Sequence, residues 1–362
     1  MLRDAPDEDK LSVLTAAVAA DAASRDEDGA FPRRAFDELT ACGVVAEPPL
    51  AARETRILLQ LLAAVGRGDL NVGRIFEGHV NALLLIELYG DDAQRAAYRR
   101  AAEDGALFGV WNTDAPGDPL RIEDGRLQGK KNFASGVDGL SYAIVTVAEQ
   151  GRRQMIVAPT AGLRVDRSWW RPLGMRASGS HIADFTGLAI QPDWALGKGD
   201  DYLAPPWFSA GAARFLAVQV GGAHAVMDAA VEHLRRTKRA ADPHQAARLA
   251  RMGTAVETGY LWLGRMADAW ATARAPDDDA ALRATVDGGR VAVERAALDV
   301  LEEAERAVGA AGFIAPHRLE RLLRDLRTYL RQPNPDGAAG GFGAAIASGE
   351  WEPGLALRRR SR

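Results

Sequence analysis

Short segments rich in Val, Ile, Phe and Tyr set residues 107–190 apart from the rest of the chain. Turn-forming Gly, Asp and Ser residues separate these segments at roughly ten-residue spacing, which is typical of a compact antiparallel β-barrel or β-sandwich. The predicted strands are Leu107–Trp111, Arg126–Ala134, Tyr142–Ala148, Gln154–Ala158 and Ser180–Ile190.

Apolar residues recur at helical spacing on both sides of this β-rich stretch. Before it, helical patterns run from about Lys10 to Gly105, and Glu54–Val65 and Leu70–Tyr89 are apolar on one face. After it, the pattern predicts long helices with short connections, which is typical of an up-and-down bundle. These helices are Phe208–Arg239, Asp242–Ala275, Ala280–Val308 and His317–Leu330. Within the first of them, Gly221 and Gly222 would let a neighbouring backbone approach closely.

We therefore predict an α+β protein with an N-terminal helical domain, a middle antiparallel β-barrel domain and a C-terminal four-helix bundle. The expected boundaries are 1–105 for the helical domain, 106–203 for the β domain and 204–335 for the bundle. Residues 336–362 are rich in Gly and Ala and end in a run of arginines, so we expect a loose tail there.

Composition excludes several classes of function. The chain has 362 residues and a net charge of -4, and this balance does not suggest a nucleic acid or a membrane surface as partner. Cys42 is the single cysteine, so no internal disulfide can form, and no Cys/His spacing resembles a metal site. No apolar run is long enough to span a membrane, and Met1–Lys10 lacks an apolar signal region. We expect a cytoplasmic protein.

Four local motifs follow one another along the chain. They are Gly66–Leu70 followed by Gly78-His79, then Gly129–Gly136 (Gly-Lys-Lys-Asn-Phe-Ala-Ser-Gly), then Pro172–Ser180, and finally Gly309–Phe313 followed by Leu319–Asp325. Their order and spacing, together with the order of the predicted domains, resemble the acyl-CoA dehydrogenase superfamily. The resemblance covers nearly the whole chain.

This resemblance implies an FAD cofactor whose ring lies against the β domain. Phe133 stands where the superfamily places an aromatic side chain against the isoalloxazine, and Ser135 stands where a hydroxyl lies near flavin N5. An aromatic wall excludes water, and preorganised hydrogen-bonding groups tune the reduction potential of the ring. The residues that the resemblance places around the ring are Trp111, Asn112, Thr113, Phe133, Ala134 and Ser135.

The helices of a neighbouring subunit hold the ADP half of FAD in this superfamily. The matching positions are Arg236, Gln245, Gly309 and Gly312. The chain departs from the pattern here, because Thr237–Ala240 replaces the usual Phe-Gly motif and the glycine loop reads Gly-Ala-Ala-Gly. Alanine is less suited than glycine to a close backbone approach to pyrophosphate. Shared cofactor sites imply a homodimer or homotetramer.

Acyl-CoA dehydrogenation needs a carboxylate that removes the α-proton of the acyl thioester. The position that most members use for this Glu falls on Pro333, after Gln332, and a second position used by a minority falls on Ala213. In the flavin monooxygenase branch a His near the C-terminal position often assists, and Gln332 stands there. Asp336 is the nearest carboxylate and therefore the candidate base, although it also suits a turn at Asn334–Gly337.

Three functions remain open. The first is an FAD-dependent oxidoreductase that carries out α,β-oxidation of an acyl thioester, with acyl-CoA as the substrate class and a non-standard base. The second is a flavin-dependent monooxygenase that uses reduced flavin from a partner reductase, which the missing Phe-Gly motif and missing carboxylate favour. The third is a catalytically inactive paralogue that acts as a binding or partner subunit, which the empty base position supports.

Overall fold

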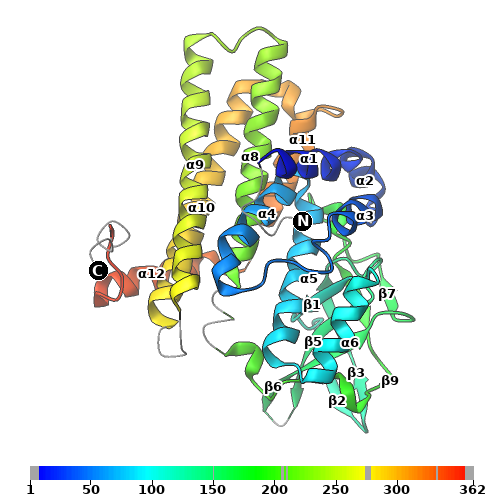
Figure 1. Ribbon diagram of the computed structural model, residues 1–362. Coiled ribbons are helices and arrows are strands. Elements are labelled where there is room, and N and C mark those ends of the chain that lie inside the picture. Colours follow the sequence, from blue (N-terminus) through cyan, green and yellow to red (C-terminus); the bar gives the residue numbers. More distant parts are fainter. Residues whose placement is uncertain are drawn as a thin grey trace. The chain divides into compact units, whose positions relative to one another are not determined.

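The computed structural model describes residues 8–149, 151–204, 208, 211–273, 279–331 and 333–354 (Figure 1). The chain forms two compact units. We call the first the β unit, made of the described residues of Met1–Leu50 and Asn71–Ala204, and the second the bundle unit, made of those of Ala51–Leu70 and Pro205–Arg362. Pro205 and Pro206, which follow the predicted boundary between residues 203 and 204, lie outside the described residues.

Helices α1 (Glu8–Ala19), α2 (Ala22–Asp28), α3 (Arg33–Ala41), α5 (Leu70–Tyr89) and α6 (Asp92–Glu103) accompany the strands of the β unit. The start of α6 shows how local sequence determines where a helix begins. The Asp91 side chain accepts a hydrogen bond from Gln94 N at 2.8 Å, and the Gln94 side chain accepts one from Asp91 N at 3.1 Å. This capping box satisfies donors at the helix end that would otherwise lack partners.

The strands form two sheets. The seven-stranded sheet has the order β10-β6-β5-β2-β3-β9, with β1 also paired to β5, and the three-stranded sheet has the order β4-β8-β7. The bounds are β1 Phe108–Trp111, β2 Arg121–Glu123, β3 Arg126–Gln128, β4 Lys130–Ala134, β5 Tyr142–Glu149, β6 Arg152–Pro159, β7 Arg164–Asp166, β8 His181–Asp184, β9 Leu188–Ala189 and β10 Ala195–Leu196.

The predicted antiparallel barrel needs correction in two respects. First, β1 and β2 both pair with β5 in parallel, because the chain returns to β5 by a crossover and not by a hairpin. Second, the predicted strand Arg126–Ala134 is two strands in different sheets, divided at Gly129. Gly129 has φ +105°, and a Cβ there would lie 2.3 Å from Pro119 O, so only glycine allows this corner. The predicted strand Ser180–Ile190 likewise divides into β8 and β9.

The core of the β unit lies between α5, α6 and the larger sheet. Ile86 of α5 and Tyr98 of α6 pack with Phe108, Ile144 and Val157 of the strands. Burial of this apolar surface is the main favourable contribution to folding of the unit.

His79 of α5 is buried in the same region and has partners on both ring nitrogens. Its Nδ1 accepts from Phe108 N at 3.2 Å, so its Nε2–H donates to Val45 O at 2.8 Å. Burial lowers the pKa of His79 to about 4, which keeps the ring neutral. His79 therefore fastens α5 to the start of β1.

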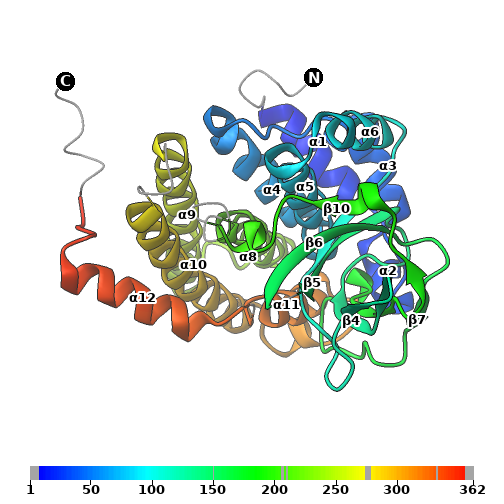
Figure 2. The same ribbon diagram turned by 90° about the horizontal axis from the view of Figure 1, so that it is seen from below.

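The bundle unit contains α4 (Thr55–Gly68), α8 (Ala212–Arg236), α9 (Pro243–Thr272), α10 (Asp279–Val308), α11 (Arg318–Tyr329) and α12 (Pro335–Ser348). Helices α8, α9 and α10 lie side by side, as Figure 2 shows from one end. The structure divides the chain differently from the prediction of a domain over residues 1–105, because α4 packs on α8 and belongs to the bundle unit. Among the described residues, no helix has the length and apolar character to cross a membrane.

Residues 335–348 correct the expectation of a loose tail from residue 336. They form α12, which begins after Asn334, whose side chain accepts from Gly337 N at 3.0 Å. Phe342 of this helix packs edge-on against Trp351 with ring centroids 4.7 Å apart. Tertiary packing therefore outweighs the low helix propensity of a Gly-rich segment. The arginine run at the end of the chain lies outside the described residues.

The crossing of α4 and α8 depends on glycine. A Cβ at Gly221 would lie 2.0 Å from Ala63 O, and a Cβ at Gly66 would lie 2.4 Å from Val218 O. The two backbones therefore touch, as Gly221 in the sequence predicted.

We expect Gly221→Ala to lower the free energy of unfolding by at least about 1–3 kcal/mol, because the added methyl group overlaps a backbone oxygen that cannot move away alone. The matched control is Gly253→Ala in α9, where a Cβ would meet nothing within 4 Å. This variant should gain up to about 1 kcal/mol from helix propensity. Urea denaturation of both variants checks the pair, and equal stabilities would contradict the close crossing.

Candidate functional site

The end of β1 and the end of β4 meet in the β unit and bring the predicted ring-contacting residues together. The Trp111 indole Nε1 donates to Ser135 O at 3.2 Å, and Asn132 N donates to Thr113 O at 3.0 Å. Trp111 and Ala134 are buried, whereas Thr113 and Phe133 are exposed. Trp111 and Ala134 therefore support this surface from behind, and Thr113 and Phe133 present it.

A buried polar network fixes the segment after β1. The side chain of Lys131 is fully buried, and its Nζ donates to Asp114 Oδ1 at 2.6 Å and to Asn112 O at 3.0 Å. Desolvation lowers the pKa of Lys131, and the hydrogen bond and charge of Asp114 oppose that shift. Asn112 Oδ1 accepts from Thr146 Oγ1 at 2.7 Å and from Arg153 Nη1 at 2.8 Å. The side-chain oxygen of Asn112 thus already accepts two hydrogen bonds from protein groups.

Phe133 has a strained backbone and a partly exposed ring. Its φ is +51°, a left-handed conformation that costs a bulky residue about 1–2 kcal/mol, and its exposed fraction is 43%. The ring packs edge-on against Trp169 and Trp170, with centroid distances of 5.0 Å and 6.0 Å. We call Phe133, Trp169 and Trp170 the aromatic cluster. Strain and exposure at one aromatic residue are characteristic of functional sites.

The hydroxyl group of Ser135 lies behind this surface in a chain of serine hydroxyls. Ser135 Oγ lies 2.8 Å from Ser180 Oγ, which lies 2.8 Å from Ser178 Oγ. The sequence placed Ser178 and Ser180 in a motif but assigned them no role. Trp169 and Trp170 belong to none of the four motifs.

These residues fit the ring of a flavin, which has a planar apolar face and hydrogen-bonding edges. The aromatic cluster supplies an exposed apolar surface. Asn132 Oδ1 is buried and has no hydrogen-bond partner among the residues that the structure describes, so it is an acceptor available to a bound group. Ser135 adds a hydroxyl oxygen.

A polar hollow of about 480 Å³ also borders Trp170. In it, Asp138 Oδ2 lies 3.3 Å from His181 Nε2, and Asp138 Oδ1 accepts from Arg167. The hydrogen bond from His181, followed by that from Arg167, lowers the pKa of Asp138. This hollow is lined by paired charges, in contrast with the aromatic cluster.

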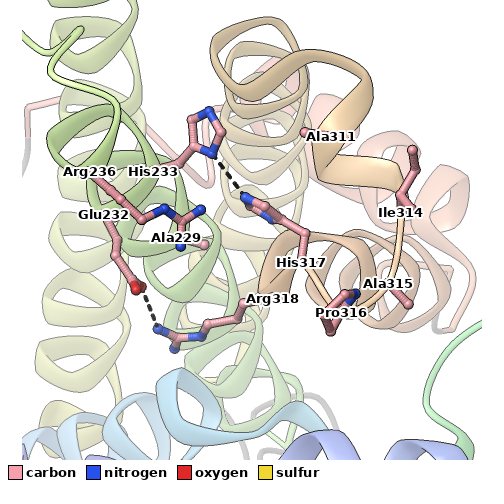
Figure 3. A pocket seen from close by; sticks show the side chains of 10 residues that line it. All are labelled: Ala229, Glu232, His233, Arg236, Ala311, Ile314, Ala315, Pro316, His317 and Arg318. Carbon is pink, nitrogen blue, oxygen red and sulfur yellow. Dashed lines mark hydrogen bonds and ion pairs between the residues drawn. The ribbon is translucent and has the colours of Figure 1, made fainter.

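The bundle unit contains a pocket of about 580 Å³ (Figure 3). We call it the bundle pocket. Arg236 of α8 and Ala311 of the 3-10 helix η6 (Gly309–Phe313) both line it, so the structure brings the predicted Arg236 and glycine loop together. Gln245 is absent from its lining. Gln245 is buried at the start of α9, where its backbone N–H donates to Asp242.

Two histidines meet in the bundle pocket. His317 Nδ1 accepts from Leu319 N at 3.2 Å, so its Nε2–H donates to His233 Nδ1 at 3.0 Å. Desolvation is the largest cause that lowers the pKa of both histidines, and the positive charge of Arg236 lowers both further. The sequence did not reveal this pair, because 84 residues separate its members. Arg318 and Glu232, 4.0 Å apart, complete the charged lining.

Comparisons with known proteins agree with this architecture. Residues 206–330 match the family model of the acyl-CoA dehydrogenase C-terminal domain. The predicted resemblance to the acyl-CoA dehydrogenase superfamily is confirmed. FMN-bound TdsC from Paenibacillus sp. A11-2 shares the fold, with a TM-score of 0.83 at 18% identity over 95% of this chain and 98% of that chain. KijD3 in complex with FMN and a dTDP-linked amino sugar gives a TM-score of 0.79 at 24% identity over 96% and 94%.

A relative of known name is also similar to this chain in its sequence. The dibenzothiophene monooxygenase of Rhodococcus erythropolis is 25% identical, over 90% of this chain and 90% of that protein.

The positions at which the superfamily carries its base hold no carboxylate in the described residues. Ala213 is buried in α8, and Pro333 precedes α12. Gln332 lies outside the described residues. Asp336 is exposed in the first turn of α12, where a carboxylate favours the helix dipole. That placement accounts for Asp336 structurally, and its role as a base stays a prediction.

The histidine pair gives a prediction about pH. Arg236→Gln should raise the pKa of both His233 and His317, because it removes a positive charge that faces both rings. Arg239→Gln is the matched control and should raise the pKa of His233 alone, since Arg239 affects only that ring. NMR titration of the ring protons measures both values. Identical responses to the two substitutions would refute this pocket geometry.

The sign of the linked effect on stability follows from the lowered values. Between the folded pKa and the unfolded value of about 6.5, the unfolded chain binds more protons than the folded chain. The contribution of the pair to stability is therefore present above that unfolded value and is lost as the pH falls through the window. Arg236→Gln should narrow the pH range over which this stability is lost, because it raises the folded pKa values of both histidines toward the unfolded value.

Proposed function

We propose that this chain is a flavin-dependent monooxygenase that takes up flavin in its reduced form. The observation that carries the proposal is the 25% identity to a dibenzothiophene monooxygenase over 90% of both chains. Oxidation of an acyl thioester, the first of the expected functions, needs a base to remove an α-proton. Ala213 and Pro333 cannot supply one, and oxygen insertion does not require it.

For the cofactor we propose FMN in place of the FAD that the resemblance implied. TdsC and KijD3, which share the fold, are both described with FMN. The departures at Thr237–Ala240 and in the Gly-Ala-Ala-Gly loop also fit a flavin without an ADP half. Arg236 and Arg318 line a pocket whose charge suits a phosphate group, and the superfamily pattern would bring them from a second copy of the chain.

The residues of the β unit would act by binding and orienting. Phe133 and its tryptophan neighbours would cover an apolar ring and exclude water, which strengthens the hydrogen bonds around it. Asn132 Oδ1 and Ser135 Oγ would hold polar edges. When bound in its reduced form, the flavin supplies two electrons, with which one atom of molecular oxygen enters the substrate and the other leaves as water.

The substrate that this proposal implies is a small molecule with an aromatic or other apolar face. The relative that carries the proposal is named for dibenzothiophene, which is a planar aromatic compound. A TdsC structure contains indole, which is a planar aromatic compound. In the polar hollow beside Trp170, carboxylates accompany the arginines, so the hollow offers no net positive charge to the phosphates of CoA.

We expect the purified protein to bind reduced FMN and to transfer labelled oxygen from O₂ to members of a panel of sulfur and nitrogen heteroaromatics. Phe133→Ala should weaken FMN binding by about tenfold, because it removes stacking and apolar contact with the ring. Leu261→Ala, at an exposed apolar position on α9, is the control and should leave the affinity unchanged. Fluorescence titration and mass spectrometry give the two readouts.

The other two functions predict different results. Anaerobic bleaching of the bound flavin by acyl-CoA thioesters would establish the dehydrogenase. Binding of FMN without labelled product or acyl-CoA turnover would favour a catalytically inactive partner subunit. Failure to bind either FMN or FAD would overturn the proposal as a whole.

A further inference from the structure

We propose that Ser178 and Ser180 are positioning residues that make Ser135 Oγ a hydrogen-bond acceptor toward the flavin, and that this selects the reduced flavin over the oxidised one. The inference rests on the proposed function for the presence of a flavin ring beside Ser135. It goes beyond that function because it assigns a direction to the hydroxyl and a role to two residues that do not belong to the expected site.

The direction follows from counting protons. The series of serine hydroxyls makes three contacts, each 2.8 Å long. They run from Ser135 Oγ to Ser180 Oγ, from Ser180 Oγ to Ser178 Oγ, and from Ser178 Oγ to Met175 O. Each serine hydroxyl has one proton to donate, and the carbonyl of Met175 can only accept. Three protons must serve three contacts. Ser178 therefore donates to Met175 O, Ser180 donates to Ser178, and Ser135 donates to Ser180.

The only other acceptor near Ser135 within the described protein is a weak one. Phe133 O lies 3.5 Å from Ser135 Oγ, at the limit of a hydrogen bond. Ser180 Oγ, at 2.8 Å, therefore holds the proton of Ser135, which can turn to a bound group only when Ser180 no longer accepts it. Ser135 Oγ then offers only lone pairs to a bound group.

The surroundings hold this arrangement in place. All three serines are buried, so water does not compete for their protons. Gly136 N donates to Ser178 O at 2.8 Å and ties the segment after Ser135 to the 3-10 helix η2 (Arg176–Ser178). If the serine hydroxyls donated in the opposite direction, the carbonyl oxygen of Met175 would face a hydroxyl oxygen with no proton between them. Such a contact is unfavourable in a buried site.

An acceptor at this position distinguishes the two redox states of a flavin. N5 of the oxidised ring carries a lone pair and no proton, so two acceptors would face each other. N5 of the reduced ring carries a proton and can donate to Ser135 Oγ. A monooxygenase that receives its flavin already reduced benefits from this preference, because oxidised flavin then competes poorly for the site.

The test compares the dissociation constants of oxidised and photoreduced FMN, measured without oxygen, in the wild type and three variants. The wild type should bind reduced FMN more tightly. Ser180→Ala removes the acceptor for the Ser135 proton and frees that proton to point at N5. The preference for reduced FMN should fall by about five- to tenfold, the usual effect of one hydrogen bond. The midpoint potential of the bound flavin should fall in parallel.

Ser178→Ala is the sharper variant, since Ser178 is two hydrogen bonds away from Ser135 in the direction of Met175. Without Ser178, Ser180 can donate to Ser135, and the proton of Ser135 again becomes available to N5. The preference should fall as in Ser180→Ala. Thr160→Val is the matched control, because it removes a different buried hydroxyl of the β unit, which donates to Leu140 O. It should leave the preference unchanged.

The outcomes separate the two proposals. If the wild type binds FMN but Ser178→Ala and Ser180→Ala, both folded by circular dichroism, keep its preference for the reduced form, the positioning role is wrong and the proposed function stands. If either folded variant loses the preference and Thr160→Val does not, the role is supported. If the wild type binds flavin in neither state, both proposals fail together.

Discussion

The buried ammonium group of Lys131 is the interaction on which the geometry of the β unit depends. A charge without solvent must be paired and hydrogen-bonded, or its burial costs several kcal/mol. Its two short contacts, to Asp114 Oδ1 at 2.6 Å and Asn112 O at 3.0 Å, both come from the segment after β1. The ammonium therefore fixes that segment against β4. It acts together with the hydrogen bond from Asn132 N to Thr113 O, which joins the ends of the same two strands.

The position of Phe133 follows from this anchor. Lys131 must point inward to reach Asp114, and Ala134 is buried opposite His181, so the register between them shifts by a bulge. A bulge re-aims the side chains next to it. Phe133 takes a left-handed conformation and turns its ring outward to Trp169, and Ser135 continues inward to the serine chain. The strained backbone of one residue thus places an apolar ring and a hydroxyl on the same short segment.

Periodicity predicted the elements of the chain well, and it failed where tertiary contacts decide. The helices of the bundle, the strands near β5 and β6, and the close approach at Gly221 all followed from local patterns. The division at Gly129 did not, because the contact that forbids a Cβ there comes from Pro119. The helix α12 was missed for a related reason. Its Gly-rich sequence resembles a loose tail, and only the packing of Phe342 and Trp351 shows otherwise.

The candidate site shows the same limit. The resemblance assigned Phe133, Ser135 and Arg236 to a flavin, and the structure has Phe133 and Ser135 on one short segment of the β unit and Arg236 in the bundle pocket. Motif spacing could not connect Ser135 with Ser178 and Ser180, since the contact depends on how β4 lies against the loop before β8. Sequence proximity is informative within one strand or helix turn, and a hydroxyl chain across two segments has no such signature.

Arg236 and Arg318 would attract an anion to the bundle pocket, and the two histidines beside them would respond to its charge. Arg236 already makes protonation of His233 and His317 unfavourable. The two arginines of the pocket are therefore charged while the two histidines are neutral. A bound phosphate would offset the repulsion from Arg236 and raise both pKa values. By linkage, binding would then take up protons at pH values between the pKa values of the free and the bound pocket, and the histidines would favour binding more as the pH falls through that range. A pair of arginines alone would bind the same anion without taking up protons on the protein. The histidine pair therefore makes the affinity of the bundle pocket for an anion depend on pH.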